Sequence, residues 1–518
     1  MTQSGKVRRL AAGSRNGYQD AAGPPRTALG ALLALACLLA ALPCAALDSA
    51  VLIRELHFPA ISLDLDVSFP IRDLRIPPSK DPQADIEALN KRLETDDSPE
   101  MHLELARLLL WTGQYELAVV HYRVATDGYT KLLEKDPKNA RAHQQLAEVL
   151  IALGEDEDAA AHIEDAYVYD DKLWQAHELA SYLHAKNGVH AHDAGLRWLM
   201  ESHFAAAESE GGRAVELGPT EPLAHVALFL SKWLPLLIAL REDPLSGLKR
   251  IAEFEEVSEL LLRAANLAPN YPRLRQHAVS CKLAPFFAAQ MMKGISEPIW
   301  PTLDETQKRL LTSCRDEYME LVQAAPELKA RVLLFAGIAE FMMDNRKAMY
   351  QRFRDAADAD PQDSAGLQTM VGFLVHEKKW PEALQVAEEL MQRSPSGEAY
   401  TWLGRIYGEQ EKWKQAEEAF RVALSYEDVR GIANLGLGIV LLKSGADPSA
   451  AVPVLRAAAE ELPGEPEVAL AWGVAQALTG QQEKGAQCVA RALAMLPPSP
   501  GRQAVADQFG LKLDATQP

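Results

Sequence analysis

The sequence predicts an all-α solenoid of stacked helical hairpins, preceded by a short N-terminal β-like arm. Alanine and leucine dominate the 518 residues, and β-branched residues are sparse after about residue 80, which favours helix. Four prolines lie between helical stretches at regular intervals: Pro361, Pro395, Pro463 and Pro497. Their separations are 34, 68 and 34 residues, so the middle interval is twice the others. Proline is disfavoured inside a helix, so this spacing marks a 34-residue unit. An alternation of apolar and polar residues at 61–71 predicts the arm.

Residues 1–46 have the features of a secretory leader. Five basic residues precede an uncharged run at 27–47, and Cys44-Ala45-Ala46 supplies small residues for cleavage after Ala46. The run is also just long enough to cross a bilayer, so an uncleaved membrane anchor is the alternative. We therefore expect an exported protein, periplasmic or secreted, that is either released or held by this segment.

Residues 47–98 are expected to form an extended arm and linker. The alternating stretch at 61–71 has the period of a β-strand, and residues 51–58 could pair with it. An unpaired alternating edge invites aggregation, so capping of the first repeat is the preferred role. Addition of a strand to a partner's sheet is the alternative.

The clearest repeat unit is the stretch GEAYTWLGRIYGEQEKWKQAEEAFRVALS, residues 397–425. Apolar and small residues share one face of each of two helices, at Tyr400, Leu403, Gly404 and Tyr407 and then at Ala416, Phe420 and Ala423. A ligand pocket could use the same residue types, but aromatics at helical spacing belong more often to a core. We therefore expect these side chains to pack two antiparallel helices together.

This pattern resembles the tetratricopeptide repeat family, in which aromatic, Leu, Gly/Ala, Tyr, Ala, aromatic, Ala and Pro positions recur at fixed steps. Looser copies contain Leu105-Ala106, Leu146-Ala147, Leu437-Gly438 and Trp472-Gly473, and about seven repeats are recognisable. The resemblance implies a right-handed superhelix whose first helices line a concave surface that holds peptides or partner helices. The expected layout is N-terminal repeats at 99–171, irregular helical repeats at 172–326, a C-terminal array at 327–498 and a capping helix and tail at 499–518.

Charge and cysteine content limit the possible partners. The full chain has a net charge of −19, and removal of residues 1–46 leaves 48 basic against 71 acidic residues, a net charge of −23. Such a chain is repelled by nucleic acid and anionic lipid, and it favours polar or basic protein segments. After the leader, the cysteines are Cys281, Cys314 and Cys488, which we expect to be buried free thiols rather than a disulfide framework.

Two further stretches could carry a function. His184, His190, His192 and Asp193 lie close together in the sequence and could gather a divalent metal, but Lys186-Asn187-Gly188 is typical of a solvated turn. Residues 223–240 are the most apolar after the leader, and we expect a buried helix rather than a partner groove or a membrane span. No nucleophile elbow, phosphate loop or metalloprotease helix occurs in the sequence. We expect no enzyme activity, no cofactor and no metal site.

The most concrete expectation is a protein-protein interaction scaffold that binds a peptide or partner helix in the concave face. Transfer of the family's groove positions to the best repeats gives eight exposed partner-binding candidates: Gln144, Gln145, Glu148, Gln368, Thr369, His376, Trp402 and Arg405. Gln144 and Glu148 stand where some family members carry a clamp for C-terminal carboxylates, so that clamp is not expected. The alternatives are a membrane-anchored assembly factor and a metal-dependent helical enzyme.

Overall fold

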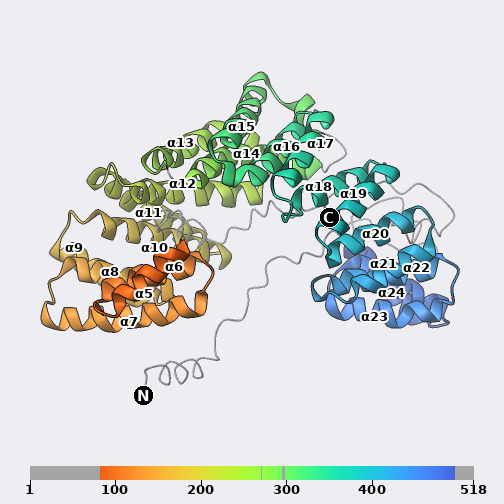
Figure 1. The fold of residues 1–518 in the computed structure, drawn as a ribbon, viewed down its shortest axis with the longest axis horizontal. Coiled ribbons are helices and arrows are strands. Elements are labelled where there is room, and N and C mark those ends of the chain that lie inside the picture. Colours follow the sequence, from red (N-terminus) through yellow and green to blue (C-terminus); the bar gives the residue numbers. More distant parts are fainter. Residues whose placement is uncertain (1–81, 270, 294–297, 496–518) are drawn as a thin grey trace, which may run out of the picture.

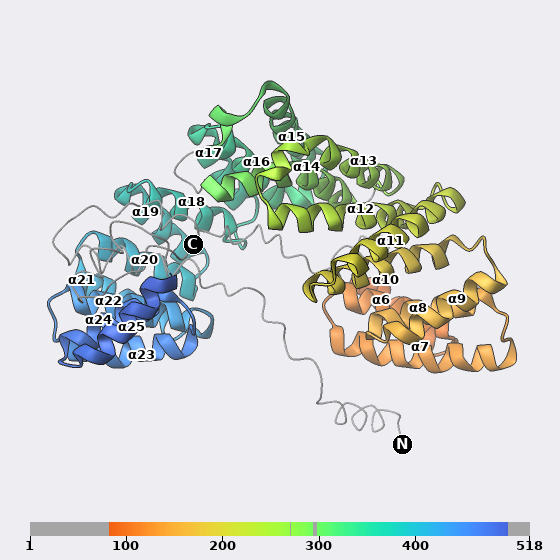
Figure 2. The same cartoon turned by 180° about the vertical axis from the view of Figure 1, so that it is seen from behind.

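A computed structural model describes residues 82–269, 271–293 and 298–495. These residues contain twenty-one α-helices and no β-strand. Helix α5 (Pro82–Leu93) comes first, and ten helical hairpins follow it along an arch (Figure 1). The two ends of the arch, near α7 and near α23, lie on the same side of the molecule (Figure 1). The view from behind shows the same arrangement (Figure 2). The predicted all-α hairpin solenoid is confirmed for these residues.

Each hairpin consists of an even-numbered first helix and an odd-numbered second helix. The N-terminal five are α6 (Pro99–Trp111) with α7 (Tyr115–Lys135), α8 (Ala140–Leu153) with α9 (Asp156–Tyr169), α10 (Trp174–Asp193) with α11 (Arg197–Leu217), α12 (Pro222–Glu242) with α13 (Ile251–Leu267), and α14 (Pro272–Lys293) with α15 (Glu305–Ala324). The C-terminal five are α16 (Lys329–Met342) with α17 (Arg346–Ala359), α18 (Ala365–His376) with α19 (Trp380–Arg393), α20 (Gly397–Glu409) with α21 (Trp413–Ala423), α22 (Arg430–Lys443) with α23 (Ala451–Glu461), and α24 (Pro466–Leu478) with α25 (Gln482–Met495).

The first helices form the inner layer of the solenoid. From α8 to α24, each first helix contacts the next first helix, and each second helix packs on the first helix that follows it. In the described part of the chain, no two successive second helices pack against each other as closely as successive first helices do. A first helix is therefore covered by neighbours on several sides, whereas a second helix keeps one face toward solvent.

The longer spacing of the N-terminal repeats comes from helix length. Helices α7, α10 and α11 have 21, 20 and 21 residues, whereas α8 and α9 have 14 each. Each longer helix has about seven extra residues, which is close to two full turns of 3.6 residues. The apolar side chains before and after the extra turns therefore still lie on the same face of the helix. The tight turns of these three hairpins use left-handed glycines at one constant spacing, Gly113, Gly154 and Gly195, with φ of +78°, +81° and +71°.

The structure corrects two details of the predicted layout. Part of the region assigned to an extended linker, 47–98, is helix α5, because Ile86 and Leu89 are buried against the first hairpin. The predicted turn at Lys186-Asn187-Gly188 lies inside the continuous helix α10. Gly188 serves a close approach, since a Cβ there would lie 2.9 Å from the Phe204 ring of α11. The leader, the 61–71 arm and the 499–518 tail lie outside the described residues.

Helix α12 is the one described helix whose length and apolar composition would allow it to cross a membrane. It packs between α11 and α13 and on α10, and thirteen of its residues are buried. Lys232 stays half-buried, and its Nζ lies 2.9 Å from Glu208 Oε1. The buried-helix interpretation of this stretch is confirmed.

The packing of the clearest repeat also follows the sequence. Phe420 of α21 is 2% exposed, and a Cβ on Gly404 of α20 would lie 2.9 Å from its ring. Ala416 and Ala423 are fully buried beside it. The aromatic and small residues therefore hold two helices together, as predicted. Cys281, Cys314 and Cys488 are buried free thiols, also as predicted.

Candidate functional site

Trp402, one of the eight predicted groove residues, is not exposed. Its side chain is 5% exposed and belongs to the core formed by hairpins α18/α19 and α20/α21. The indole lies against Gly372 of the preceding first helix, where a Cβ would lie 3.7 Å from the ring. The Arg405 guanidinium lies 5.6 Å from the centre of the Trp402 ring. The expectation of an exposed tryptophan was wrong because the neighbouring repeat covers that face of α20.

Three other predicted groove residues are buried as well: Gln144, Glu148 and Thr369. Glu148 accepts two hydrogen bonds from Arg107, from Nε at 2.8 Å and from Nη2 at 2.7 Å. This bidentate pair joins the first helices α6 and α8 and is a strong hydrogen-bonded geometry. Glu148 therefore connects two repeats, and the expectation of an exposed side chain was wrong here too.

The remaining four candidates are half-buried on first helices: Gln145, Gln368, His376 and Arg405. The Gln368 side-chain amide donates to Glu398 at the start of the next first helix. Burial, followed by the charge of Arg346, lowers the pKa of His376 to about 4, so its imidazole is neutral at pH 7. These four residues stay accessible enough to contact a partner.

Buried polar side chains are concentrated in the inner layer. Of the eighteen buried polar or charged side chains in the described residues, seventeen lie on first helices and one, Ser258, lies on a second helix. Burial of a polar group costs free energy unless it is hydrogen-bonded. The inner layer therefore differs chemically from the outer layer, which places small apolar residues such as Ala125 and Ala166 against its neighbours.

Histidine pairs form a second distinct feature, which the sequence prediction missed. In three consecutive hairpins a histidine of the first helix faces a histidine of the second helix. The Nδ1–Nδ1 distances are 2.8 Å for His102–His121, 2.9 Å for His143–His162 and 3.2 Å for His184–His203. The two members of a pair have the same sequence separation in all three hairpins, and the pairs follow one another at the spacing of the turn glycines.

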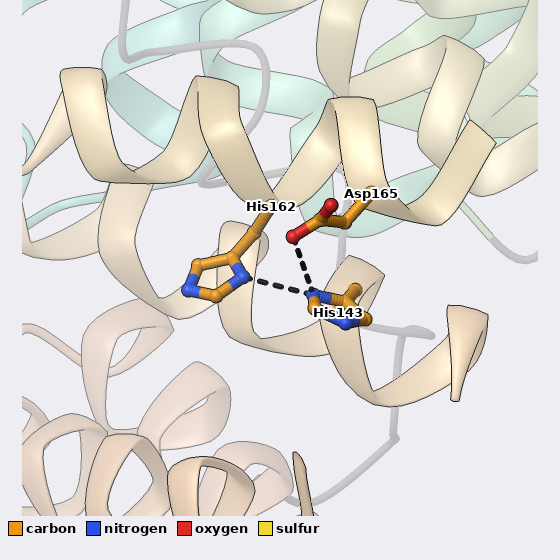
Figure 3. A group of neighbouring side chains, drawn as sticks. All are labelled: His143, His162 and Asp165. Atoms are coloured by element: carbon orange, nitrogen blue, oxygen red, sulfur yellow. Dashed lines mark hydrogen bonds and ion pairs between the residues drawn. The ribbon is translucent and has the colours of Figure 1, made fainter. Parts of the chain in front are cut away.

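The middle pair has a carboxylate beside it (Figure 3). Asp165 Oδ2 lies 3.6 Å from His143 Nδ1, and the His143 side chain is 7% exposed against 49% for Asp165. His143 Nε2 lies 3.1 Å from the Pro137 carbonyl oxygen. A carbonyl oxygen only accepts hydrogen bonds, so Nε2 carries the proton and the Nδ1 lone pair faces His162 and Asp165. Burial, followed by His143, lowers the pKa of His162.

The histidines that the sequence suggested as a metal cluster are not brought together. His184 faces His203 on α11, whereas His190 is exposed. His192 Nδ1 instead lies 3.9 Å from Glu242 Oε1 at the end of α12. The three side chains diverge because α10 is one continuous helix, on which positions 184, 190 and 192 do not share a face.

Two tetratricopeptide repeat family models match the chain, over residues 403–466 and 129–161, which correspond to helices α20–α23 and to α8 with parts of α7 and α9. The chain is a tetratricopeptide repeat protein. No curated protein sequence matches it.

The chain also matches solved structures at low sequence identity. Yeast Tom70 is 13% identical, with 83% of this chain and 92% of that chain covered and a TM-score of 0.41. YrrB, described as a TPR protein with an unusual peptide-binding site, is 16% identical, with 37% and 97% covered and a TM-score of 0.29. A tetratricopeptide repeat protein from Parabacteroides merdae is 11% identical, with 53% and 99% covered and a TM-score of 0.34. With such low TM-scores, neither the superhelical curvature nor the binding partner of these proteins can be assigned to this protein.

The signal that could have revealed the histidine pairs is present in this tetratricopeptide repeat sequence. Gly113, Gly154 and Gly195 recur at a constant period longer than the expected 34-residue unit. Each of these glycines has one histidine before it and one after it at unchanging offsets: His102 and His121, His143 and His162, and His184 and His203. The shorter expected period conceals this relation, because the N-terminal repeats carry extra turns.

Proposed function

We propose that this protein is an exported interaction scaffold that binds an extended segment or a helix of a partner protein along the inner layer of first helices. The observation that supports this function is the concentration of buried polar side chains on those helices. A layer that only held the solenoid together would gain more from apolar residues. Polar groups fixed by neighbours can recognise the backbone and polar side chains of a bound segment with little loss of entropy.

Gln145, Gln368, His376 and Arg405 are the proposed contact residues, because they combine a place on a first helix with partial exposure. The net charge of −23 without residues 1–46 favours a polar or basic partner segment. The uncharged run at 27–47 supports export, with cleavage after Ala46 as the preferred outcome.

A matched pair of variants tests the binding face. Arg405 lies on the first helix α20, and Arg421 lies on the second helix α21 of the same hairpin with its side chain 59% exposed. Capture from the exported compartment, with identification of the bound protein, is compared for wild type, Arg405→Ala and Arg421→Ala. Arg405→Ala should reduce recovery of the partner while Arg421→Ala leaves it unchanged. Equal recovery with both variants would refute an inner binding face.

The membrane-anchored assembly factor is the second candidate, because the uncharged run is long enough to span a bilayer. Intact-mass measurement of the exported protein separates the two. A mature chain that begins at Leu47 excludes the tether, and a chain that retains residues 27–47 in the membrane fraction supports it.

A further inference from the structure

The geometry points to a divalent metal site, of the class that zinc occupies, formed by His143, His162 and Asp165 between helices α8 and α9. This inference is independent of the partner-binding function. The three ligand atoms lie within 4.8 Å of one another, and they come from both helices of one hairpin (Figure 3). Bound metal would connect α8 to α9 near the open end of that hairpin.

His143 is oriented as a metal ligand would be. Its Nε2–H donates to the Pro137 carbonyl oxygen, so Nδ1 presents a lone pair to His162 and Asp165. Metal-binding histidines commonly donate the second ring N–H to a carbonyl or carboxylate in this way, which fixes the tautomer. The lone pair of Nδ1 and the Asp165 carboxylate, 3.6 Å apart, repel each other in the neutral imidazole state. A cation between them removes that repulsion.

The distances between the ligand atoms fit coordination of one metal ion. With metal–ligand bonds of about 2.0–2.1 Å, the 2.9 Å separation of the two Nδ1 atoms corresponds to a ligand–metal–ligand angle of about 90°. The 3.6 Å separation of His143 Nδ1 and Asp165 Oδ2 corresponds to about 125°. These angles bracket the tetrahedral value. Asp165 has the freedom to approach His162, because its side chain is half-exposed and stands three residues further along α9.

The neighbouring repeats act as internal controls for the metal site. The position of Asp165 is occupied by Val124 in the first hairpin and by Ala206 in the third. Each of those hairpins has the histidine pair but no carboxylate three residues after its second histidine. Two imidazoles alone bind such metals more weakly than two imidazoles and a carboxylate, so the middle hairpin should bind Zn²⁺ most tightly.

The test is Zn²⁺ titration of the chelator-treated full chain by calorimetry, with one equivalent bound as the expected result. His162→Gln and Asp165→Asn should weaken the affinity of that equivalent at least tenfold. Glutamine can still donate to His143, and asparagine has the shape of aspartate, so folding should persist and circular dichroism checks it. His121→Gln and His203→Gln are the matched controls and should leave the first equivalent unchanged.

A gain of binding gives a second, independent readout. Val124 is 40% exposed on α7, so Val124→Asp places a carboxylate beside His102 and His121 without opening the core. The variant should bind a second Zn²⁺ equivalent. The site is refuted if wild type shows no saturable equivalent, if Asp165→Asn binds like wild type, or if His203→Gln weakens binding as much as His162→Gln.

Discussion

Two adjacent glycines of helix α11 allow the close packing of the N-terminal repeats to be tested with one substitution type. A Cβ on Gly211 would lie 2.9 Å from Leu228 Cα, 3.0 Å from Leu228 N and 3.0 Å from Ser181 Oγ. The next residue, Gly212, has no heavy atom within 4 Å of its Cβ position. Both lie in the interior of α11, so alanine brings the same gain in helix propensity, about 1 kcal/mol, at either position.

The expected effects have opposite signs. The backbone of Leu228 cannot rotate away, and displacement of Ser181 would disturb its 2.7 Å hydrogen bond to the Ala207 carbonyl oxygen. Overpacking of this kind costs about 1–3 kcal/mol, and loss of the hydrogen bond adds about 1 kcal/mol. Gly211→Ala should therefore lower the free energy of unfolding by about 1–3 kcal/mol after the propensity gain, whereas Gly212→Ala should raise it by about 0.5–1 kcal/mol.

Thermal and urea unfolding of the two single variants, followed by circular dichroism, provides the measurement. Opposite shifts of the melting temperature support the close approach of α11 to α12 at Gly211. If Gly211→Ala stabilises the protein as much as Gly212→Ala, the two helices are further apart than described, and the reasoning fails.

Three further predictions concern a glycine, a tryptophan and a histidine. Gly404→Leu should lower the free energy of unfolding by about 1–3 kcal/mol, because even a Cβ meets the Phe420 ring at 2.9 Å, and unchanged melting would contradict the helix register. Trp402→Ala should cost about 3–5 kcal/mol because the indole is 5% exposed, and a cost below about 0.5 kcal/mol would show that it faces solvent. Burial, followed by His102, lowers the pKa of His121 from 6.5 to about 4, so the unfolded chain binds this proton first and stability should fall as pH decreases from about 6.5 to 4. One pKa unit corresponds to about 1.4 kcal/mol, and after a discount for solvent screening of this half-buried ring the expected loss of stability is about 1–2 kcal/mol. His121→Gln should remove this loss from the pH dependence of the unfolding free energy. If wild type and variant show the same pH dependence, the lowered pKa of His121 is wrong.

The sequence predicted the elements better than their environment. Leu403, Gly404 and Phe420 carry a helical spacing that fixes which faces meet inside one hairpin, and the structure confirms that contact. The same spacing does not predict which other face of α20 is covered by the neighbouring repeat. Trp402 does not lie on the face that carries Leu403 and Gly404, and it was expected to be exposed to solvent. It is buried because α18 approaches it at Gly372. Burial between repeats depends on superhelical stacking, which a pattern within one repeat does not contain.

The paired histidines show how a different period changes what a repeat sequence reveals. The three hairpins that carry them have different residues at otherwise equivalent places, such as Tyr122, Ile163 and Phe204, which pack the second helix. The pairs nevertheless recur at the same separation in all three. An N–H···N contact between two buried or half-buried imidazoles contributes little net stability, because each ring gives up water to form it. Apolar side chains would fill the same space at lower cost, so packing alone does not account for three such pairs. A ligand that uses both Nδ1 atoms accounts for the middle pair, where a carboxylate completes the set. The outer two pairs provide the same geometry without a carboxylate at the position of Asp165.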